Sequence, residues 1–138
     1  MAISFATIVI GHRYTRAHLA TTWGYAGIQA IARGVVTPAE DNKIILFVTE
    51  EKRAGDEQYE DELAGTILLW EGPNDHFAEE RMLRHHETGD EIHLFFRAQH
   101  RDDFEYLGLL RLYCCQRFTD QPSRFVFRVR RTSTEPAT

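Results

Sequence analysis

The chain has 138 residues, 43% of them hydrophobic and 27% charged, which is the size and composition of one globular domain. No apolar run approaches the length of a membrane-spanning helix, and the apolar N-terminus lacks a basic leading region, so neither a membrane span nor a signal peptide is expected. The formal net charge of −5 argues mildly against a polyanionic partner.

The first half of the chain is predicted to contain two strands and two short helices. Residues 3–10 are rich in β-branched residues and stop at Gly11, so they are expected to form a strand. Thr15 is the expected N-cap of a helix that runs to about Trp23, and residues 28–33 are expected to form a second short helix. The nearly continuous apolar run over residues 43–49 predicts a central strand.

The second half opens with a charged loop, the acidic and aromatic stretch of residues 58–62, and a strand over residues 66–71 that contains Trp70. Asp75 is the expected cap of a helix over about residues 76–86. Apolar alternation then predicts strands over residues 91–97, from 104 towards 118, and over 123–130. Gly108, inside the long strand, predicts a bulge or a close backbone approach.

These elements predict a mixed α+β domain with a strongly bent sheet or a small barrel, made of about six strands and two or three short helices. Residues 1–130 are expected to form a single domain, and the polar residues 131–138 a disordered tail.

Charge is distributed unevenly along the chain. Nineteen of the 21 acidic residues lie between positions 39 and 105, whereas residues 1–38 contain three arginines and no acid, and residues 106–138 contain six arginines and two acids. A fold that brings the two ends together would create a basic face that the net charge hides. The equally weighted alternative is that these arginines form ion pairs with the acidic middle.

The sequence gives little support for catalysis or for a bound cofactor. Its seven histidines lack the spacing of a zinc-binding helix, and no phosphate-binding loop, nucleophile elbow or dinucleotide fingerprint is present. Cys114 and Cys115 are adjacent, so in a strand they point to opposite faces and do not form an ordinary disulfide; a reduced, cytoplasmic setting fits best. An apolar strand is expected to bury these thiols and raise their pKa rather than activate them.

Aromatic rings at the ends of the predicted elements are the clearest candidates for a binding site, together with one carboxylate. Rings stack on nucleic-acid bases, and a carboxylate such as Asp61 can accept a hydrogen bond from the exocyclic amine of cytosine. The alternative interpretation is that these rings belong to the core or its rim and that Asp61 caps a turn. The candidate base-pocket residues are Tyr59, Asp61, Trp70, Trp23, Tyr25 and Tyr106.

Six motifs occur in the order and approximate spacing of one known family and cover about residues 11 to 129. They are residues 13–16, residues 45–49 followed by Lys52, residues 59–61, Leu69-Trp70, residues 92–97 and residues 104–108. With these motifs the chain resembles a bacterial domain found fused to HNH endonucleases and to helicase–nuclease restriction proteins. That family looks related to the SRA and PUA-like domains, which bind modified or flipped bases in nucleic acid.

The resemblance implies an SRA/PUA-like partly open β-barrel that reads a modified cytosine, 5-methyl or 5-hydroxymethyl, in double-stranded DNA. The family's Tyr-x-Asp and Trp positions fall on Tyr59, Asp61 and Trp70, and their assignment to the base pocket is an inference from their chemistry. The sequence shows no HNH-like histidine cluster, so a nuclease is expected as a fused domain or a separate subunit. The arginines expected to hold phosphates are Arg13, Arg16, Arg33, Arg97, Arg124 and Arg128.

Two other functions remain open at this point. The exposed aromatics and the acidic surface would also suit a protein-interaction module or a homodimer. A hydrolase that acts on a nucleotide ranks last, because no pair of nucleophile and base is visible in the sequence.

Overall fold

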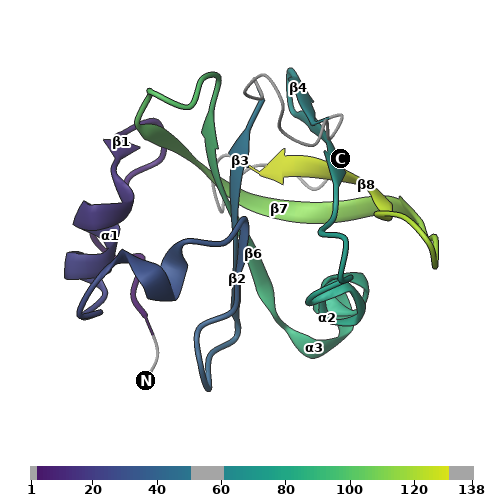
Figure 1. The fold of residues 1–138 in the computed structure, drawn as a ribbon, viewed down its shortest axis with the longest axis horizontal. Helices are drawn as coiled ribbons and strands as arrows, with labels where there is room; N and C mark the ends of the chain where they lie inside the picture. Colours follow the sequence, from purple (N-terminus) through teal and green to yellow (C-terminus); the bar gives the residue numbers. More distant parts are fainter. Residues whose placement is uncertain (1–2, 51–60, 131–138) are drawn as a thin grey trace.

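The computed structural model describes residues 3–50 and 61–130. Within these residues one bent sheet of eight strands is accompanied by three short α-helices and one 3-10 turn (Figure 1). The strands are β1 (Arg13–Tyr14), β2 (Val35–Val36), β3 (Lys43–Thr49), β4 (Glu62–Ala64), β5 (Ile67–Glu71), β6 (Glu91–Arg97), β7 (Phe104–Gln116) and β8 (Arg124–Arg130). The helical elements are α1 (Arg16–Thr22), η1 (Ile28–Ile31), α2 (Glu79–Leu83) and α3 (His85–Thr88).

The strands follow the order β2-β3-β6-β7-β8-β5-β4, and β1 pairs with β7 beside this path. β3 and β6 are parallel and the other paired strands are antiparallel. β2 and β4 stand at the two ends of this order, so the barrel is partly open. In Figure 1, α1 lies on one side of the upright strands β3 and β6, and α2 and α3 lie on the other side.

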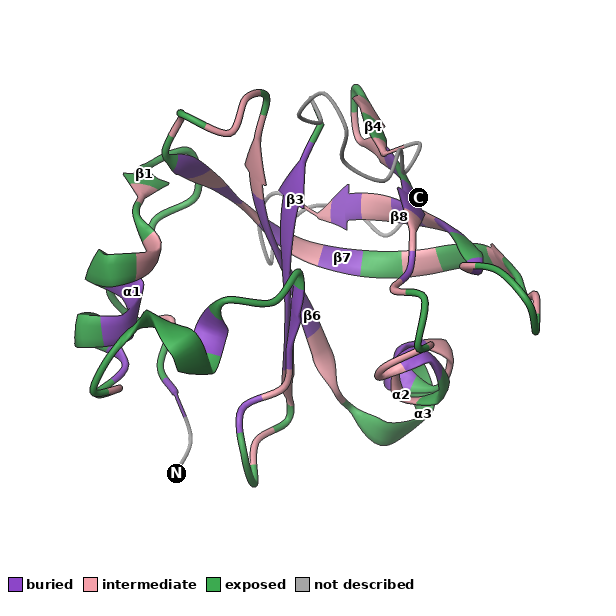
Figure 2. Cartoon of the chain, viewed as in Figure 1, coloured by how far each residue is buried: buried purple, intermediate pink, exposed green. Residues whose placement is uncertain are grey.

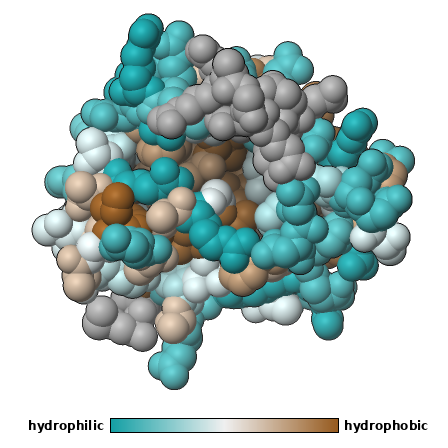
Figure 3. Space-filling model, viewed as in Figure 1, coloured by the Kyte–Doolittle hydropathy of each residue, from teal (hydrophilic) through white to brown (hydrophobic). Residues whose placement is uncertain are grey.

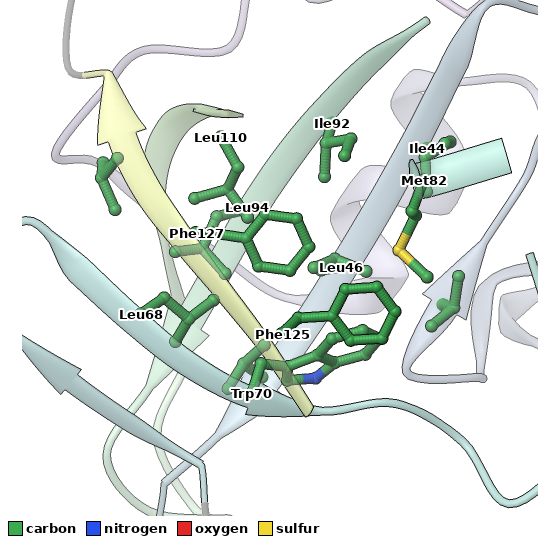
Figure 4. Close-up of a cluster of buried hydrophobic side chains, with 13 residues drawn as sticks. Ile44, Leu46, Leu68, Trp70, Met82, Ile92, Leu94, Leu110, Phe125 and Phe127 are labelled. Carbon is green, nitrogen blue, oxygen red and sulfur yellow. The ribbon is translucent and has the colours of Figure 1, made fainter. Parts of the chain in front are cut away.

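β3 is the central strand, as its apolar run predicted. Six of its seven residues are buried, because the strand is covered on both faces (Figure 2). Ile44, Leu46 and Val48 point into one hydrophobic cluster, which also contains Trp70 and is drawn in Figure 4. Ile45 and Phe47 point into a second cluster under α1. A strand buried on both faces reads as a continuous apolar run rather than an alternating one.

Gly108 produces the bulge that the sequence indicated. The register between β6 and β7 shifts between Leu94 and Phe95, and Gly108 lies opposite Leu94 with a φ of +101°. The shift reverses which face of β7 is turned inward, so Tyr106 enters the second cluster whereas Leu110 enters the first. One strand can therefore serve both halves of the core.

Two sequence predictions about elements are wrong. Residues 3–10 form turns rather than a strand, with Ile3 anchored by its amide to Asp41 Oδ2 at 2.6 Å. The helix expected over residues 76–86 is two short helices that meet at Arg84, and its first turn is absent because His76 and Ala78 have positive φ angles of 57° and 61°. Within the described residues, no helix combines the length and the apolar character needed to cross a membrane.

Candidate functional site

A cavity of about 260 Å³ opens between the β2–β3 side of the barrel and the end of β5. Figure 3 shows an apolar hollow near the centre of this face of the molecule. The cavity brings together three of the residues that the sequence singled out: Asp61, Trp70 and Arg33. Its other lining residues are Gly34, Val35, Phe47, Glu71, Gly72 and Pro73.

Asp61 supplies a half-buried carboxylate at the wall of this cavity. Its Oδ1 accepts a hydrogen bond of 2.9 Å from the backbone amide of Glu71, across the antiparallel pair β4–β5. That bond fixes the position of the carboxylate relative to Trp70, which is the residue before Glu71. An oriented carboxylate of this kind accepts hydrogen bonds from amines such as the one on cytosine.

Trp70 and Phe47 form the aromatic part of the lining. Trp70 is only 6% exposed, and its ring packs at 5.2 Å from Phe125 and 6.0 Å from Phe127, measured between ring centroids. Phe47 stacks on Phe95 at 5.2 Å. Phe47 points into the second core cluster, on the other face of β3 from the cluster that contains Trp70, so Trp70 is the aromatic side chain on the cavity side and only a small part of it is exposed.

Arg33 stands at the rim of the cavity and is exposed. Its guanidinium forms an ion pair with Asp75 at 3.1 Å and lies 4.4 Å above the ring of Phe77. The two contacts orient the side chain while leaving the cation accessible to solvent. An exposed pair of this kind is weak, so a phosphate can compete for the guanidinium.

Three of the remaining predicted pocket residues lie elsewhere in the described structure. Trp23 is in the second core cluster, and its Nε1 donates to the carbonyl of Ser4 at 3.0 Å. Tyr106 is in the same cluster, where its hydroxyl is 2.8 Å from His93 Nδ1 and burial raises its pKa. Tyr25 lines a neighbouring cavity of about 320 Å³ that also contains Arg33. Tyr59 lies outside the described residues.

Arg16 and Arg97 are tied to the core by their own contacts. Arg16 Nε donates to the carbonyl of Ile31 at 3.0 Å, and the guanidinium lies 4.6 Å above the ring of Phe47. Burial, followed by the nearby charge of Arg97, lowers the pKa of Arg16 to about 10. Arg97 Nε donates to Thr49 Oγ1 at 2.8 Å, and its guanidinium lies 4.2 Å above Phe104.

The other three arginines occupy surface strands. Arg13 is exposed on β1. Arg124 and Arg128 alternate with the buried Phe125 and Phe127, so they lie on the outer face of β8. The six arginines thus do not form one continuous patch, and only Arg33 lines the candidate cavity.

Sequence reasoning missed Phe47, which was predicted only as part of a central strand, and the Gly72-Pro73 turn at the mouth of the cavity. A Gly-Pro pair is a turn signal in any sequence, but the position of this turn opposite β2 depends on how the sheet bends. Among the described residues, no cluster of three or more His, Cys, Asp or Glu side chains is arranged to hold a metal. Burial raises the pKa of Cys115 to about 11, as expected for an unactivated thiol, whereas Cys114 is exposed.

No protein-family model and no curated protein matches this chain. Among solved structures, it is similar to the SRA domain of SUVH5, crystallised in a complex with hemimethylated CG DNA. The TM-score is 0.61 and the sequence identity is 14%, and the similarity covers 99% of this chain and 97% of the other. At this identity the similarity establishes the fold, so the predicted SRA-like, partly open α+β barrel is confirmed.

Proposed function

We propose that this chain is a DNA-binding domain that recognises a modified cytosine, 5-methyl or 5-hydroxymethyl, in double-stranded DNA. The observation that carries the proposal is the cavity in which Asp61 and Trp70 lie together on an SRA-like fold. The similar SRA domain was crystallised with hemimethylated DNA, which supports the same class of ligand here.

Recognition would require the cytosine to leave the double helix, because a base edge inside the stack cannot enter a cavity. Extrusion costs a few kcal/mol, which contacts inside the pocket must offset. Trp70 offers a small, rigid aromatic surface, and Asp61 offers an acceptor for the exocyclic amine. The cavity volume of about 260 Å³ suits one planar base rather than a larger ligand.

Phosphates on either side of the extruded base would bind exposed arginines. Arg33 stands at the rim of the cavity and is the first candidate, with Arg13 and Arg124 as more distant ones. These contacts would add affinity without sequence information and would make binding fall steeply with salt.

The domain would serve as the specificity module of a modification-dependent restriction system, with the nuclease as a fused domain or a separate subunit. This part of the proposal rests on the six motifs that resemble the HNH-associated family. It assigns binding, rather than bond cleavage, to this chain.

The test is a binding series on one duplex that carries cytosine, 5-methylcytosine or 5-hydroxymethylcytosine at a single position. We expect tighter binding to one modified duplex, and Asp61→Asn should weaken binding to that duplex about tenfold or more, because a hydrogen bond to a charged group is lost. Glu62→Gln is the matched control, since it removes an equal charge from the next, exposed position. Equal binding to all three duplexes by the wild-type protein would contradict the proposal.

One observation favours a second candidate, a homodimer. Leu69 is 40% exposed and Tyr113 is 78% exposed on neighbouring parts of the sheet, and a cavity of about 300 Å³ there is lined by Leu69, Cys114 and Val126. Exposed apolar residues grouped over a sheet face are typical of protein interfaces. Light scattering on the free protein distinguishes the two candidates: a stable dimer without affinity for DNA would favour this one.

A further inference from the structure

A second polar cavity, of about 210 Å³, lies between α3 and the strands β6, β7 and β8. It shares no lining residue with the candidate base cavity. Its lining includes two arginines from neighbouring strands, Arg111 on β7 and Arg130 on β8, and His86 from α3.

Arginine side chains are grouped beside this cavity. Arg111 lies directly opposite Arg128 in the antiparallel pair β7–β8, and Arg128 and Arg130 are two positions apart on the same face of β8. Like charges directly opposite each other destabilise a sheet. On β5 the residue next to Arg128 is Ile67, and on the other side of Arg111 the register of β6 continues from Ile92 to Glu91.

The two acids in the cavity lining already have partners. Asp90 accepts two hydrogen bonds from Arg81, at 2.9 and 3.2 Å, and this contact holds the pKa of Asp90 below its usual value. Glu91 Oε1 is 3.1 Å from His93 Nε2. Asp90 is therefore neutralised by Arg81, whereas the partner of Glu91 is a histidine that burial keeps neutral.

The main evidence for a ligand in this cavity is the side chain of Arg130. Its Nε is shielded from solvent and has no hydrogen-bond partner among the described residues. A buried N–H group without a partner is destabilising, and more so when the group is charged. An acceptor brought to this nitrogen would remove that cost.

The neighbouring His85 is a structural part of the cavity wall. Its Nε2 accepts a hydrogen bond from the Leu112 amide at 3.2 Å, and its Nδ1 is 3.3 Å from the carbonyl of Asp90. Burial is the main cause of its lowered pKa; the charges of His86 and Arg111 lower the pKa further, whereas the hydrogen bond and the charge of Asp90 raise it. His85 therefore tends to be neutral and is held by its own hydrogen bonds.

We propose that this cavity binds a phosphate group through the guanidinium groups of Arg111 and Arg130, with the exposed ring of His86 as an additional donor. Guanidinium groups match the geometry of phosphate oxygens, and the buried Nε of Arg130 would gain the acceptor that it lacks. The phosphate can belong to a nucleic-acid backbone or be free in solution. The site does not depend on the base cavity, so either proposal can fail without the other.

The test measures two affinities in the full chain, for inorganic phosphate by NMR titration and for a short unmodified duplex as a function of salt. Arg130→Gln and Arg111→Gln are the test variants. Arg101→Gln is the control, because it removes the same charge from an exposed position outside the cavity lining. Arg111 is exposed, so its substitution keeps the test valid if Arg130→Gln reduces folding.

We expect both test variants to bind inorganic phosphate about tenfold more weakly than the control. A backbone phosphate as the ligand would also lower the slope of log affinity against log salt by about one for the duplex. Weaker phosphate binding with an unchanged duplex slope would instead support a free phosphate ligand. Test variants that match Arg101→Gln in both measurements would overturn the proposal.

Discussion

At the scale of single residues, the buried polar groups show which side chains are structural. His93 is 4% exposed and lies between the Tyr106 hydroxyl at Nδ1 and Glu91 at Nε2, with the ring of Phe5 stacked 3.8 Å away. Burial lowers its pKa from the ordinary 6.5 to about 4. His93 is therefore neutral in the folded protein at pH 7 and links β6 to β7.

The pKa of His93 predicts that the protein loses stability in mild acid. Between pH 6.5 and about 4 the unfolded chain binds a proton that the folded chain does not, so the free energy of unfolding falls as the pH falls. The contribution of one such group approaches about 1.4 kcal/mol per pH unit, or about 3 kcal/mol over the interval. Urea unfolding at several pH values measures it.

The variant His93→Gln should lose stability less steeply in this interval, whatever its stability at pH 7. His12→Gln, at an exposed position, is the control and should keep the wild-type slope. Equal slopes in wild type and His93→Gln would show that His93 does not titrate as its burial indicates.

At the scale of elements, β7 depends on one glycine. A Cβ at Gly108 would lie 2.7 Å from the backbone carbonyl oxygen of Arg130 and 3.2 Å from Ile10 Cδ1. The Ile10 side chain is partly exposed and can move, but the β8 carbonyl cannot. The bulge therefore requires glycine both for its positive φ and for the close approach of β8.

Gly108→Ala should consequently destabilise the protein more than a glycine substitution that adds only backbone strain. Gly11→Ala is the comparison, because Gly11 has a φ of +90° and no atom within 4 Å of the added Cβ. We expect about 1–2 kcal/mol for Gly11→Ala and about 1–3 kcal/mol more for Gly108→Ala, measured by urea unfolding. Similar losses in the two variants would mean that β8 moves away at little cost.

Elements that short-range sequence signals specify could be predicted, whereas elements that depend on distant partners could not. β3 and β6 occupy the predicted residues 43–49 and 91–97, and Thr15 caps α1 by accepting from the His18 amide, because apolar runs and caps are local signals. Among the described residues, β1, β2 and β4 have only two or three residues each and exist because of their partners. Residues 3–10 are apolar because Ile3 and Ile8 pack under α1. In the sequence this apolar pattern resembles that of a strand.

The candidate site was predictable only in part, for the same reason. Asp61, Trp70 and Arg33 were chosen by chemistry, and the structure places all three on one cavity. The same chemistry also selected Trp23 and Tyr106, which the second core cluster buries. A sequence lists aromatic rings without showing which face of the sheet each one occupies, and here the bulge at Gly108 decides this for Tyr106.

At the scale of the whole molecule, the bent sheet separates two surfaces that carry the proposed functions. The base cavity opens between β2–β3 and β5, whereas the phosphate cavity lies between α3 and β6–β8. The basic C-terminal segment predicted from sequence contributes Arg111 and Arg130 to the second surface rather than to the first. The negative net charge therefore coexists with a local group of arginines on β7 and β8.

The central claim is that a modified cytosine leaves the duplex and enters the cavity of Asp61 and Trp70. The most direct measurement is the fluorescence of 2-aminopurine placed beside the modified cytosine, which rises when its stacked neighbour is extruded. With saturating wild-type protein we predict a clear rise for the preferred modified duplex and a much smaller one for unmodified DNA, and Asp61→Asn should reduce the rise. Saturated binding to the modified duplex without any change in fluorescence would contradict the account.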